Sequence, residues 1–228
     1  MIARTPAADA ATDAELAAIL GAGAEALGLV LSAAQQDGFV AYVRLIERWN
    51  GAYNLTAVRD PRAMVVQHVL DCLAVIPPLR REMAARRGAR LLDVGSGAGL
   101  PGIVIAALEP ALNVVCVDSV GKKAAFVAHA SAELGLKNLM ALHRRVEALP
   151  RSEPFDVITC RAFGSLHDFL ALTRPLLAAG GFWMAMKGKM PTGELAQLGH
   201  IEFHVEPLIV PGLNAERCLV WIRPNQSE

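Results

Sequence analysis

Apolar residues follow two different periods along the chain, and the change from one to the other occurs near Ala89. Before that point they recur every three or four positions, within 37–49 and again within 60–76, which predicts two amphipathic helices. The second of these helices is expected to end at Pro77 and Pro78, since proline cannot continue a helix. The first third of the chain is therefore predicted to be helical.

Short apolar runs after residue 89 alternate with segments of helical period. The runs predicted as strands are 90–94, 113–119, 139–146, 155–162, 182–187, 202–212 and 216–224, and the predicted helices are 100–110, 121–135 and 165–181. Strands that are apolar throughout are typical of a parallel sheet covered by helices on both faces. This predicts an α/β fold, a doubly wound, mostly parallel, seven-stranded Rossmann-like sheet with right-handed crossovers.

These patterns divide the chain into three expected parts. Residues 1–30 should form a flexible tail and a first helical segment. Residues 31–88 should form an N-terminal helical extension, and residues 89–228 the larger α/β domain. With 54% hydrophobic residues, the chain can bury a core of ordinary size.

The segment that joins the first predicted strand to its helix, DVGSGAGLPG, contains Gly95, Gly97 and Gly99. Glycines between a strand and a helix allow a ligand to approach the backbone and the free N–H groups of the helix. A dinucleotide fingerprint requires G-x-G-x-x-G, but here the third glycine position is occupied by Leu100. The segment also lacks the Gly-Lys-Ser/Thr ending of a phosphate-binding P-loop and any cation that could neutralise a diphosphate.

Two carboxylates accompany this glycine loop. Asp93 ends the strand before the loop, which suits a ligand with a cationic end and no diphosphate. Asp118 ends the next predicted strand, close to the interval of about 20 residues at which an acidic residue binds a ribose in related folds. S-adenosylmethionine (SAM) has a sulfonium, an ammonium group and an adenosine. We therefore predict SAM as the cofactor in preference to NAD.

Further motifs follow one another in a specific order. They are RWNGAYNLT, HVLDCL, DVGSGAGLPG, DSVGKKAAF, RVE, CRAF and MKGK. Together, from about Ser32 to Arg223, they resemble the bacterial 16S rRNA methyltransferase G family, also called the glucose-inhibited division protein B family. The resemblance implies a SAM-dependent methyltransferase that modifies N7 of guanine 527 of 16S rRNA.

The resemblance also implies roles for individual residues. Gly95 and Leu100 match loop positions that line SAM. Val146 and Glu147 match the pair near the adenine, and Arg161 matches a binding arginine at the end of the fourth strand. From the residues alone, Arg161 has another possible role, an ion pair that ties this strand to a neighbouring loop.

No side chain is predicted to act as a catalytic base. N7 of guanine carries a free lone pair and no proton, so its methylation requires positioning and electrostatics. Cys160 could act as a nucleophile only in a cytosine-C5 enzyme, and it lies inside an apolar strand.

Basic residues near predicted strand ends are candidates for contacts with RNA phosphates. Lys187 and Lys189 follow the fifth predicted strand, and Arg161 is a third candidate for contact with the RNA. Five arginines lie between Arg80 and Arg90, and part of this cluster is expected to share the same edge of the sheet. The chain as a whole is neutral, with 22 basic and 22 acidic residues, which does not by itself favour a nucleic-acid partner.

The sequence shows no signal-peptide core, no apolar run as long as a membrane span and no CxxC pair, and three expectations rest on this. Asp9, Asp13 and Glu15 interrupt any signal-peptide core, and the longest apolar run is shorter than a membrane span. We expect a cytoplasmic monomer that binds 16S rRNA or the 30S subunit and no membrane. The cysteines form no CxxC pair, so no metal site is predicted.

Three alternatives stay open at this point. The chain could methylate a small molecule or a protein, or it could be an NAD-dependent oxidoreductase. It could also be a ribosome-assembly factor that keeps the fold without catalysis. The form of the RNA substrate, as naked rRNA, assembly intermediate or mature subunit, is not predicted.

Overall fold

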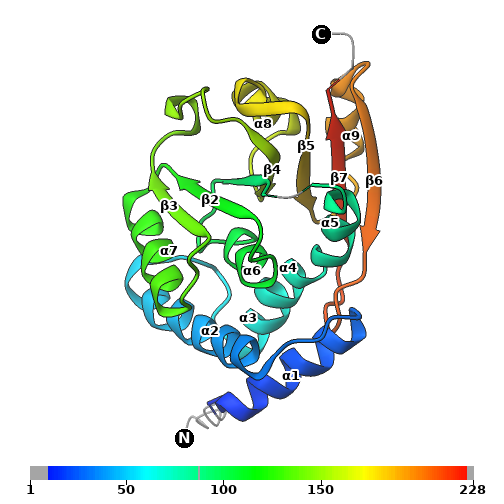
Figure 1. Ribbon diagram of the computed structural model, residues 1–228. Coiled ribbons are helices and arrows are strands. Elements are labelled where there is room, and N and C mark those ends of the chain that lie inside the picture. The colour runs from blue at the N-terminus through cyan, green and yellow to red at the C-terminus, as the bar shows by residue number, and fades with distance from the viewer. Residues whose placement is uncertain (1–9, 87, 225–228) are drawn as a thin grey trace, which may run out of the picture.

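The computed structural model describes residues 10–86 and 88–224, and it shows a single sheet with helices on both faces (Figure 1). The strands are β1 (Arg90–Val94), β2 (Asn113–Asp118), β3 (Leu139–His143), β4 (Phe155–Arg161), β5 (Leu177–Lys187), β6 (Glu202–Leu208) and β7 (Arg217–Arg223). The α-helices are α1 (Asp13–Ala26), α2 (Ala33–Tyr53), α3 (Pro61–Met64), α4 (Asp71–Leu73), α5 (Ile76–Met83), α6 (Gly102–Leu108), α7 (Gly121–Glu133), α8 (Leu166–Thr173) and α9 (Thr192–Leu195). A π-helical segment, Val65–Leu70, joins α3 to α4, and short 3₁₀ turns occupy Val146–Ala148, Arg174–Leu176 and Ala196–Leu198.

The seven strands form one sheet in the order β3-β2-β1-β4-β5-β7-β6. Strands β1 to β5 are parallel, and β7 runs antiparallel to both of its neighbours. The predicted doubly wound, mostly parallel sheet is therefore confirmed. Because the strand order reverses between β1 and β4, a crevice is expected where these two strands end, as in other open α/β sheets. We call the edge where β1 to β5 end the carboxyl edge.

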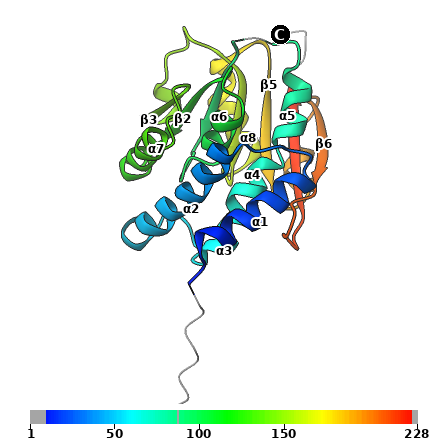
Figure 2. The same cartoon turned by 60° about the horizontal axis from the view of Figure 1, so that its bottom comes forward.

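Alternate residues of each central strand belong to different cores. In β1, Leu91 packs in the core that also contains the apolar residues of α1 to α7, whereas Leu92 packs in the core beneath α8 and α9. Figure 2 shows α1, α2 and α6 in front of the sheet and α8 behind it. Both faces of the central strands are thus buried, as their continuous apolar sequences predicted.

The N-terminal helices confirm the predicted helical period. In α2, Phe39, Val43 and Ile46 are fully buried or nearly so, and Ser32 and Gln35 form a capping box at its start. The predicted first helical segment is α1, whereas the tail expected at residues 1–9 lies outside the described residues.

Two predicted boundaries are wrong. Pro77 and Pro78 do not end the helical region. They lie in the first turn of α5, where the missing N–H of proline breaks no hydrogen bond. The helix predicted over 165–181 ends at Thr173, and β5 already begins at Leu177. The Ala-Gly run at 178–181 lies at a shift of register, between the pairs Phe155–Leu177 and Val157–Phe182 of β4 and β5, and apolar periodicity cannot reveal such a shift.

One helical stretch, Pro61–Met83, is long and apolar enough to cross a membrane by length and composition. In the fold, 72% of its apolar window is buried inside the protein. The stretch therefore packs as a core helix of a globular domain, against the sheet and α6.

Candidate functional site

The glycine loop lies at the carboxyl edge between β1 and α6. All three predicted glycines have positive φ, +66° at Gly95, +59° at Gly97 and +84° at Gly99, a backbone conformation that other residues rarely adopt. The N–H groups of Gly95 and Ser96 donate to the carbonyl of Val117 in β2, at 2.9 and 3.2 Å. The loop is therefore held against the neighbouring strand.

A fourth glycine of the loop has a packing role that the sequence analysis missed. A Cβ atom on Gly102 would lie 2.3 Å from Sγ of Cys116 and 2.9 Å from Oδ2 of Asp93. Glycine at this position lets the first turn of α6 approach β1 and β2 closely. Helix α6 can then direct its N-terminus toward the carboxyl edge.

Asp93 does not have the predicted role of facing a cationic ligand. Its side chain points to the same face of β1 as Leu91, is fully buried, and accepts a hydrogen bond of 2.8 Å from the N–H of Gly102. Its other oxygen has no hydrogen-bond partner among the residues that the structure describes. The reason is the alternation of side chains along a strand, which turns residue 93 toward α6 and away from the ligand crevice.

Burial raises the pKa of the Asp93 carboxyl to about 7. The unfolded chain releases this proton near pH 4, whereas the folded protein keeps it to about pH 7, so stability falls as pH rises through this window. We expect Asp93→Asn, which keeps an acceptor for Gly102, to match the wild type at pH 4. At pH 8 it should be more stable, by on the order of 4 kcal/mol. Urea unfolding of both proteins at these two pH values measures this difference, and parallel pH profiles would contradict the prediction.

A cavity of about 200 Å³, here called the cofactor pocket, opens beside the glycine loop. Its lining comes from the ends of β1 to β4 and from α8, and consists of Val94, Gly95, Val117, Asp118, Ser119, Arg144, Arg145, Val146, Glu147, Phe163 and Leu172. The carboxylate of Asp118 is 6% exposed and accepts hydrogen bonds from the N–H groups of Gly97 (2.9 Å) and Val120 (2.8 Å). Each oxygen keeps a further lone pair for a ligand hydroxyl.

The structure brings several predicted residues together in this pocket. Gly95, Asp118, Val146 and Glu147 all line it, although they come from three different strand ends. Leu100 differs from this group, because it is 3% exposed and packs in the core beneath the loop. Gly97 and Gly99, described above, shape the loop that carries Gly95.

A second cavity, of about 410 Å³, lies next to the cofactor pocket and is here called the second pocket. It is lined by Gln67, His68, Asp71, Arg161, Ala162, Phe163, Met186, Lys187, Gly188 and Arg217. Phe163 lines both cavities. Its ring lies 3.5 Å from the position a Cβ atom would take on Gly95.

Arg161 faces the second pocket, not the cofactor pocket. Its Nη1 donates to the carbonyl of Gln67 (3.1 Å) and to Oδ2 of Asp71 (3.2 Å). This is the ion pair between β4 and a neighbouring segment that the residues alone left open. Because the side chain is still 23% exposed, the ion pair leaves part of the guanidinium accessible.

The two predicted RNA-binding lysines have different surroundings. Nζ of Lys187 lies 2.9 and 3.0 Å from the two carboxylate oxygens of Glu194, and its side chain is only 14% exposed. Lys189 is exposed in the loop after β5. Of the two, Lys189 is therefore the cation that is accessible to solvent.

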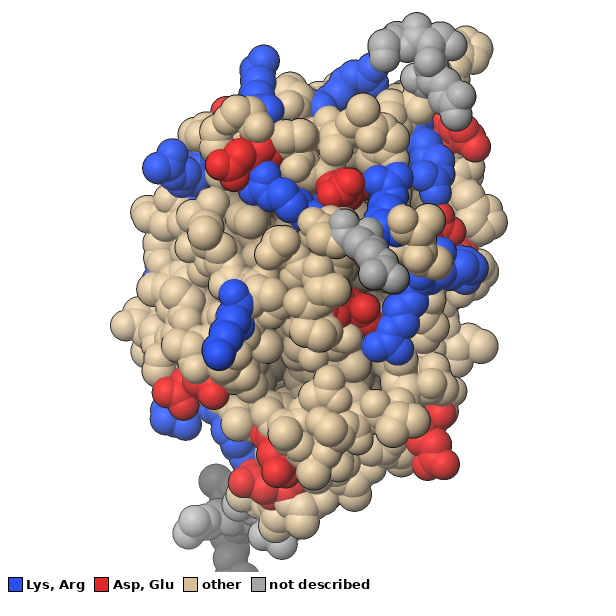
Figure 3. Space-filling model, in the orientation of Figure 1, with Lys and Arg blue, Asp and Glu red and all other residues tan. Residues whose placement is uncertain are grey.

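The described arginines between Arg80 and Arg90 do not gather at the carboxyl edge, so for them that expectation is wrong. Arg90 begins β1, at the opposite edge, and pairs with Glu153. Arg80, Arg81 and Arg86 are also paired, with Glu109, Glu206 and Asp156. Arg87 lies outside the described residues. Figure 3 shows basic and acidic side chains alternating over the upper part of one face, without a uniform basic surface.

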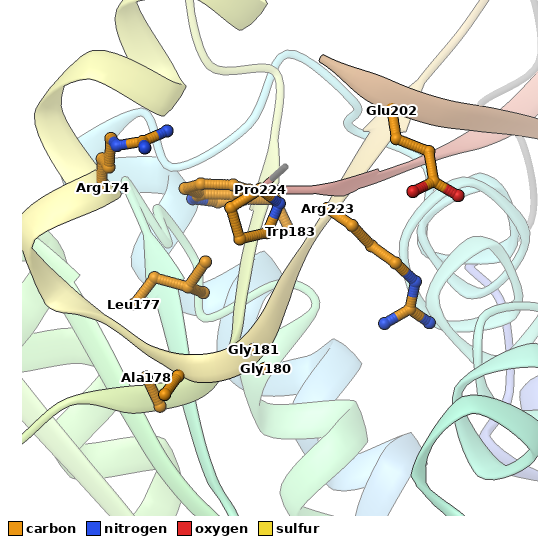
Figure 4. A pocket seen from close by; sticks show the side chains of 10 residues that line it. Arg174, Leu177, Ala178, Gly180, Gly181, Trp183, Glu202, Arg223 and Pro224 are labelled. Carbon is orange, nitrogen blue, oxygen red and sulfur yellow. The ribbon is translucent and has the colours of Figure 1, made fainter. Parts of the chain in front are cut away.

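A larger cavity, of about 570 Å³, lies far from the glycine loop, where β5 begins (Figure 4). Two of its polar groups are engaged: Arg223 pairs with Glu82 at 2.6 Å, and Nε1 of Trp183 donates to Thr173 at 2.9 Å. In parallel sheets, ligands bind where the strands end. Position and chemistry therefore favour the smaller cavities at the carboxyl edge as the functional site.

Nucleophilic catalysis by a cysteine finds no support at this edge. Burial raises the pKa of the Cys160 thiol far above its usual range, so this cysteine is protonated and unsuited to nucleophilic attack. Within residues 10–86 and 88–224, no group of three or more His, Cys, Asp or Glu side chains is placed to hold a metal ion.

Solved structures share this architecture. The N-methyltransferase NodS from Bradyrhizobium japonicum, in complex with S-adenosyl-L-homocysteine, is 12% identical with a TM-score of 0.56, over 79% of this chain and all of that one. At this identity the similarity shows the fold alone. The sheet order and the glycine-loop pocket define the class, a Rossmann-like α/β fold with a candidate nucleotide site at its carboxyl edge.

Sequence comparison assigns the chain within this class. The model of the GidB family, rRNA small subunit methyltransferase G, matches residues 35–220. Proteins named Ribosomal RNA small subunit methyltransferase G from Leptothrix cholodnii and Acidovorax sp. are 58% and 55% identical, covering 89% of this chain and 93% and 92% of theirs. The chain belongs to the rRNA small subunit methyltransferase G family. This confirms the resemblance and does not favour an oxidoreductase.

Proposed function

We propose that this protein transfers a methyl group from SAM to N7 of guanine 527 in 16S rRNA. The observation that carries the proposal is the cofactor pocket itself, built from the glycine loop and Asp118, in a chain of this family. The adjoining second pocket provides space for the methyl acceptor on the other side of Phe163.

The residues of the cofactor pocket fit SAM. Asp118 supplies a carboxylate for the two ribose hydroxyls, and the glycine loop leaves backbone open for close approach. Val146 and Phe163 offer apolar surfaces for the adenine, and Glu147 an acceptor for its amino group. Bound there, SAM would supply a methyl group on a sulfonium, which is an electrophile toward nitrogen.

The protein must also align the target base with the methyl group of SAM. Methyl transfer requires the attacking nitrogen, the methyl carbon and the sulfur to lie in line at near-attack distance. The guanine N7 brings its own lone pair, so the side chains of the second pocket need to hold the base and need not take up a proton. We assign this holding role to Phe163, which lies just after β4 and lines both the cofactor pocket and the second pocket.

The proposal also covers the partners of the protein and its location. We propose that the protein acts as a cytoplasmic monomer on 16S rRNA within, or on its way to, the 30S subunit. Lys189 and Arg161 are the proposed phosphate contacts, and Lys187 contributes less because Glu194 neutralises it.

The test of the proposed function is methylation in vitro. Purified protein and labelled SAM are incubated with 16S rRNA and with 30S subunits from cells that lack the enzyme, and the RNA is digested for nucleoside analysis. We expect label in 7-methylguanosine at a single site. Label in another nucleoside, or none in either RNA, would refute the proposal.

The exposed position of Lys189 leads to a separate prediction. We expect Lys189→Ala to weaken 16S rRNA binding and to lower the slope of log affinity against log salt by about 0.7 to 0.9, the value of one phosphate contact. Lys187→Ala should change this slope less. Filter binding at several salt concentrations measures both, and an unchanged slope for Lys189→Ala would exclude it as a phosphate ligand.

A further inference from the structure

Three charged side chains from distant parts of the chain meet at the wall of the second pocket. Asp71 of α4 accepts hydrogen bonds from Arg161, where β4 ends, and from Nε of Arg217, where β7 begins, at 3.2 and 2.8 Å. The Asp71 side chain is 3% exposed, whereas those of Arg161 and Arg217 are 23% and 24% exposed. One buried carboxylate thus holds two guanidinium groups that both reach the pocket.

The charges of this pocket do not cancel. Asp71 neutralises only one of the two arginines, and the remaining cation of the lining, Lys187, is already paired with Glu194. Burial and the neighbouring Arg161 lower the pKa of His68 to about 4, so the imidazole is neutral near pH 7. The pocket therefore keeps one positive charge without a counterion from its own lining.

The hydrogen-bond donors are also incompletely used. Nη1 of Arg161 serves Gln67 and Asp71, while Arg217 uses Nε for Asp71 and Nη1 for the carbonyl of Glu216. Among the described residues, neither Nη2 group has a hydrogen-bond partner. Guanidinium groups donate and never accept, so an acceptor completes this site, and the positive charge without a counterion favours an oxyanion over a neutral acceptor.

We propose that Asp71 is a positioning residue that holds Arg161 and Arg217 together as a clamp for a phosphodiester group of the RNA next to the target guanine. This inference rests on the proposed function. The phosphate is the anionic part of a nucleotide, and Phe163, which also lines the pocket, provides a surface on which its base can stack. The carboxylate of SAM is the other oxyanion near this site, and the test separates the two.

The clamp and simple electrostatics predict opposite results for one variant. Asp71→Asn removes a negative charge from an already cationic pocket, so electrostatics alone would strengthen RNA binding. If Asp71 instead aligns the arginines, its loss lets two like charges separate and weakens binding. The sign of the change therefore distinguishes positioning from charge.

The experiment measures methylation kinetics and binding for Asp71→Asn and a matched control, Asp156→Asn. Asp156 also bridges two groups, the Arg86 guanidinium and the Arg90 N–H, but at the opposite edge of the sheet. We expect Asp71→Asn to raise KM for 16S rRNA roughly tenfold with kcat reduced less, and Kd for SAM unchanged. The control should match the wild type. Wild-type or tighter RNA binding by Asp71→Asn would overturn the proposal.

A second pair of variants keeps the test decisive if Asp71→Asn does not fold. Arg217→Gln should weaken rRNA binding and lower its salt slope by about 0.7 to 0.9. Arg217→Lys should keep the slope but bind less tightly, because lysine lacks the planar guanidinium group that can donate two parallel hydrogen bonds to a phosphate. A loss of SAM affinity in Arg217→Gln with unchanged RNA binding would assign the clamp to the cofactor carboxylate. Absence of rRNA methylation by the wild type would refute the proposed function, whereas normal Arg217 variants would refute only the clamp.

Discussion

Asp118→Ala is expected to lower the affinity for SAM by roughly 100-fold or more. The substitution removes the carboxylate that faces the cofactor pocket from the end of β2, and each hydrogen bond to a charged acceptor contributes about 1.5 to 3 kcal/mol. It also removes the acceptor that holds the Gly97 and Val120 N–H groups, so the loop loses part of its support. Calorimetric titration with SAM measures the loss directly.

Two controls define what this result means. Asp118→Asn keeps one side-chain oxygen and should lose less affinity than Asp118→Ala. Circular dichroism must show that both variants keep the helical content of the wild type. SAM binding by Asp118→Ala at wild-type strength, or binding of NAD in place of SAM by the wild type, would show that the pocket has been assigned to the wrong ligand.

Gly102→Ala is expected to destabilise the protein by about 1 to 3 kcal/mol, the cost of overpacking a well-packed core. The new methyl group would lie 2.3 Å from Sγ of Cys116 and 2.9 Å from Oδ2 of Asp93, both of which are buried. These close contacts can be relieved only if α6 moves away from the sheet, and this movement displaces the glycine loop as well. Thermal unfolding measures the loss of stability, and a weaker affinity for SAM should accompany it.

Gly51→Ala provides the matched control for this prediction. Gly51 is also helical, in α2, but a Cβ atom there would meet no atom within 4 Å. Alanine favours helix over glycine, so this variant should be more stable by about 0.5 to 1 kcal/mol. The same substitution thus has opposite signs at two sites. Equal effects at both would show that the close approach at Gly102 does not limit α6.

Most of the cofactor pocket could be predicted from local sequence. Gly95 and Asp118 follow apolar strand segments, and parallel strands place their ends along one edge, so the two were expected to meet. Val146 and Glu147 were identified through the family resemblance, because nothing in their own sequence distinguishes them from other surface residues. The structure places all four around one cavity.

The predictions that failed concern contacts between distant parts of the chain. Asp93 was expected at the ligand, but strand alternation and the N–H of Gly102 hold it beneath α6. Part of the arginine cluster between Arg80 and Arg90 was expected near Lys187, but Arg86 and Arg90 pair with Asp156 and Glu153 at the opposite edge. In both cases the residue type was suitable. The direction of the side chain decided the outcome for Asp93, and the edge of the sheet at which they lie decided it for the arginines.

The amino-acid order already specifies the alternating elements, the glycine loop and the ligand class, because periodicity and turn chemistry act over a few neighbouring residues. Folding decides which charges become neighbours. Asp71, Arg161 and Arg217 are far apart in sequence and are joined only because α4, β4 and β7 converge at one edge of the sheet. Such contacts depend on packing and on strand order, so no local sequence pattern predicts them.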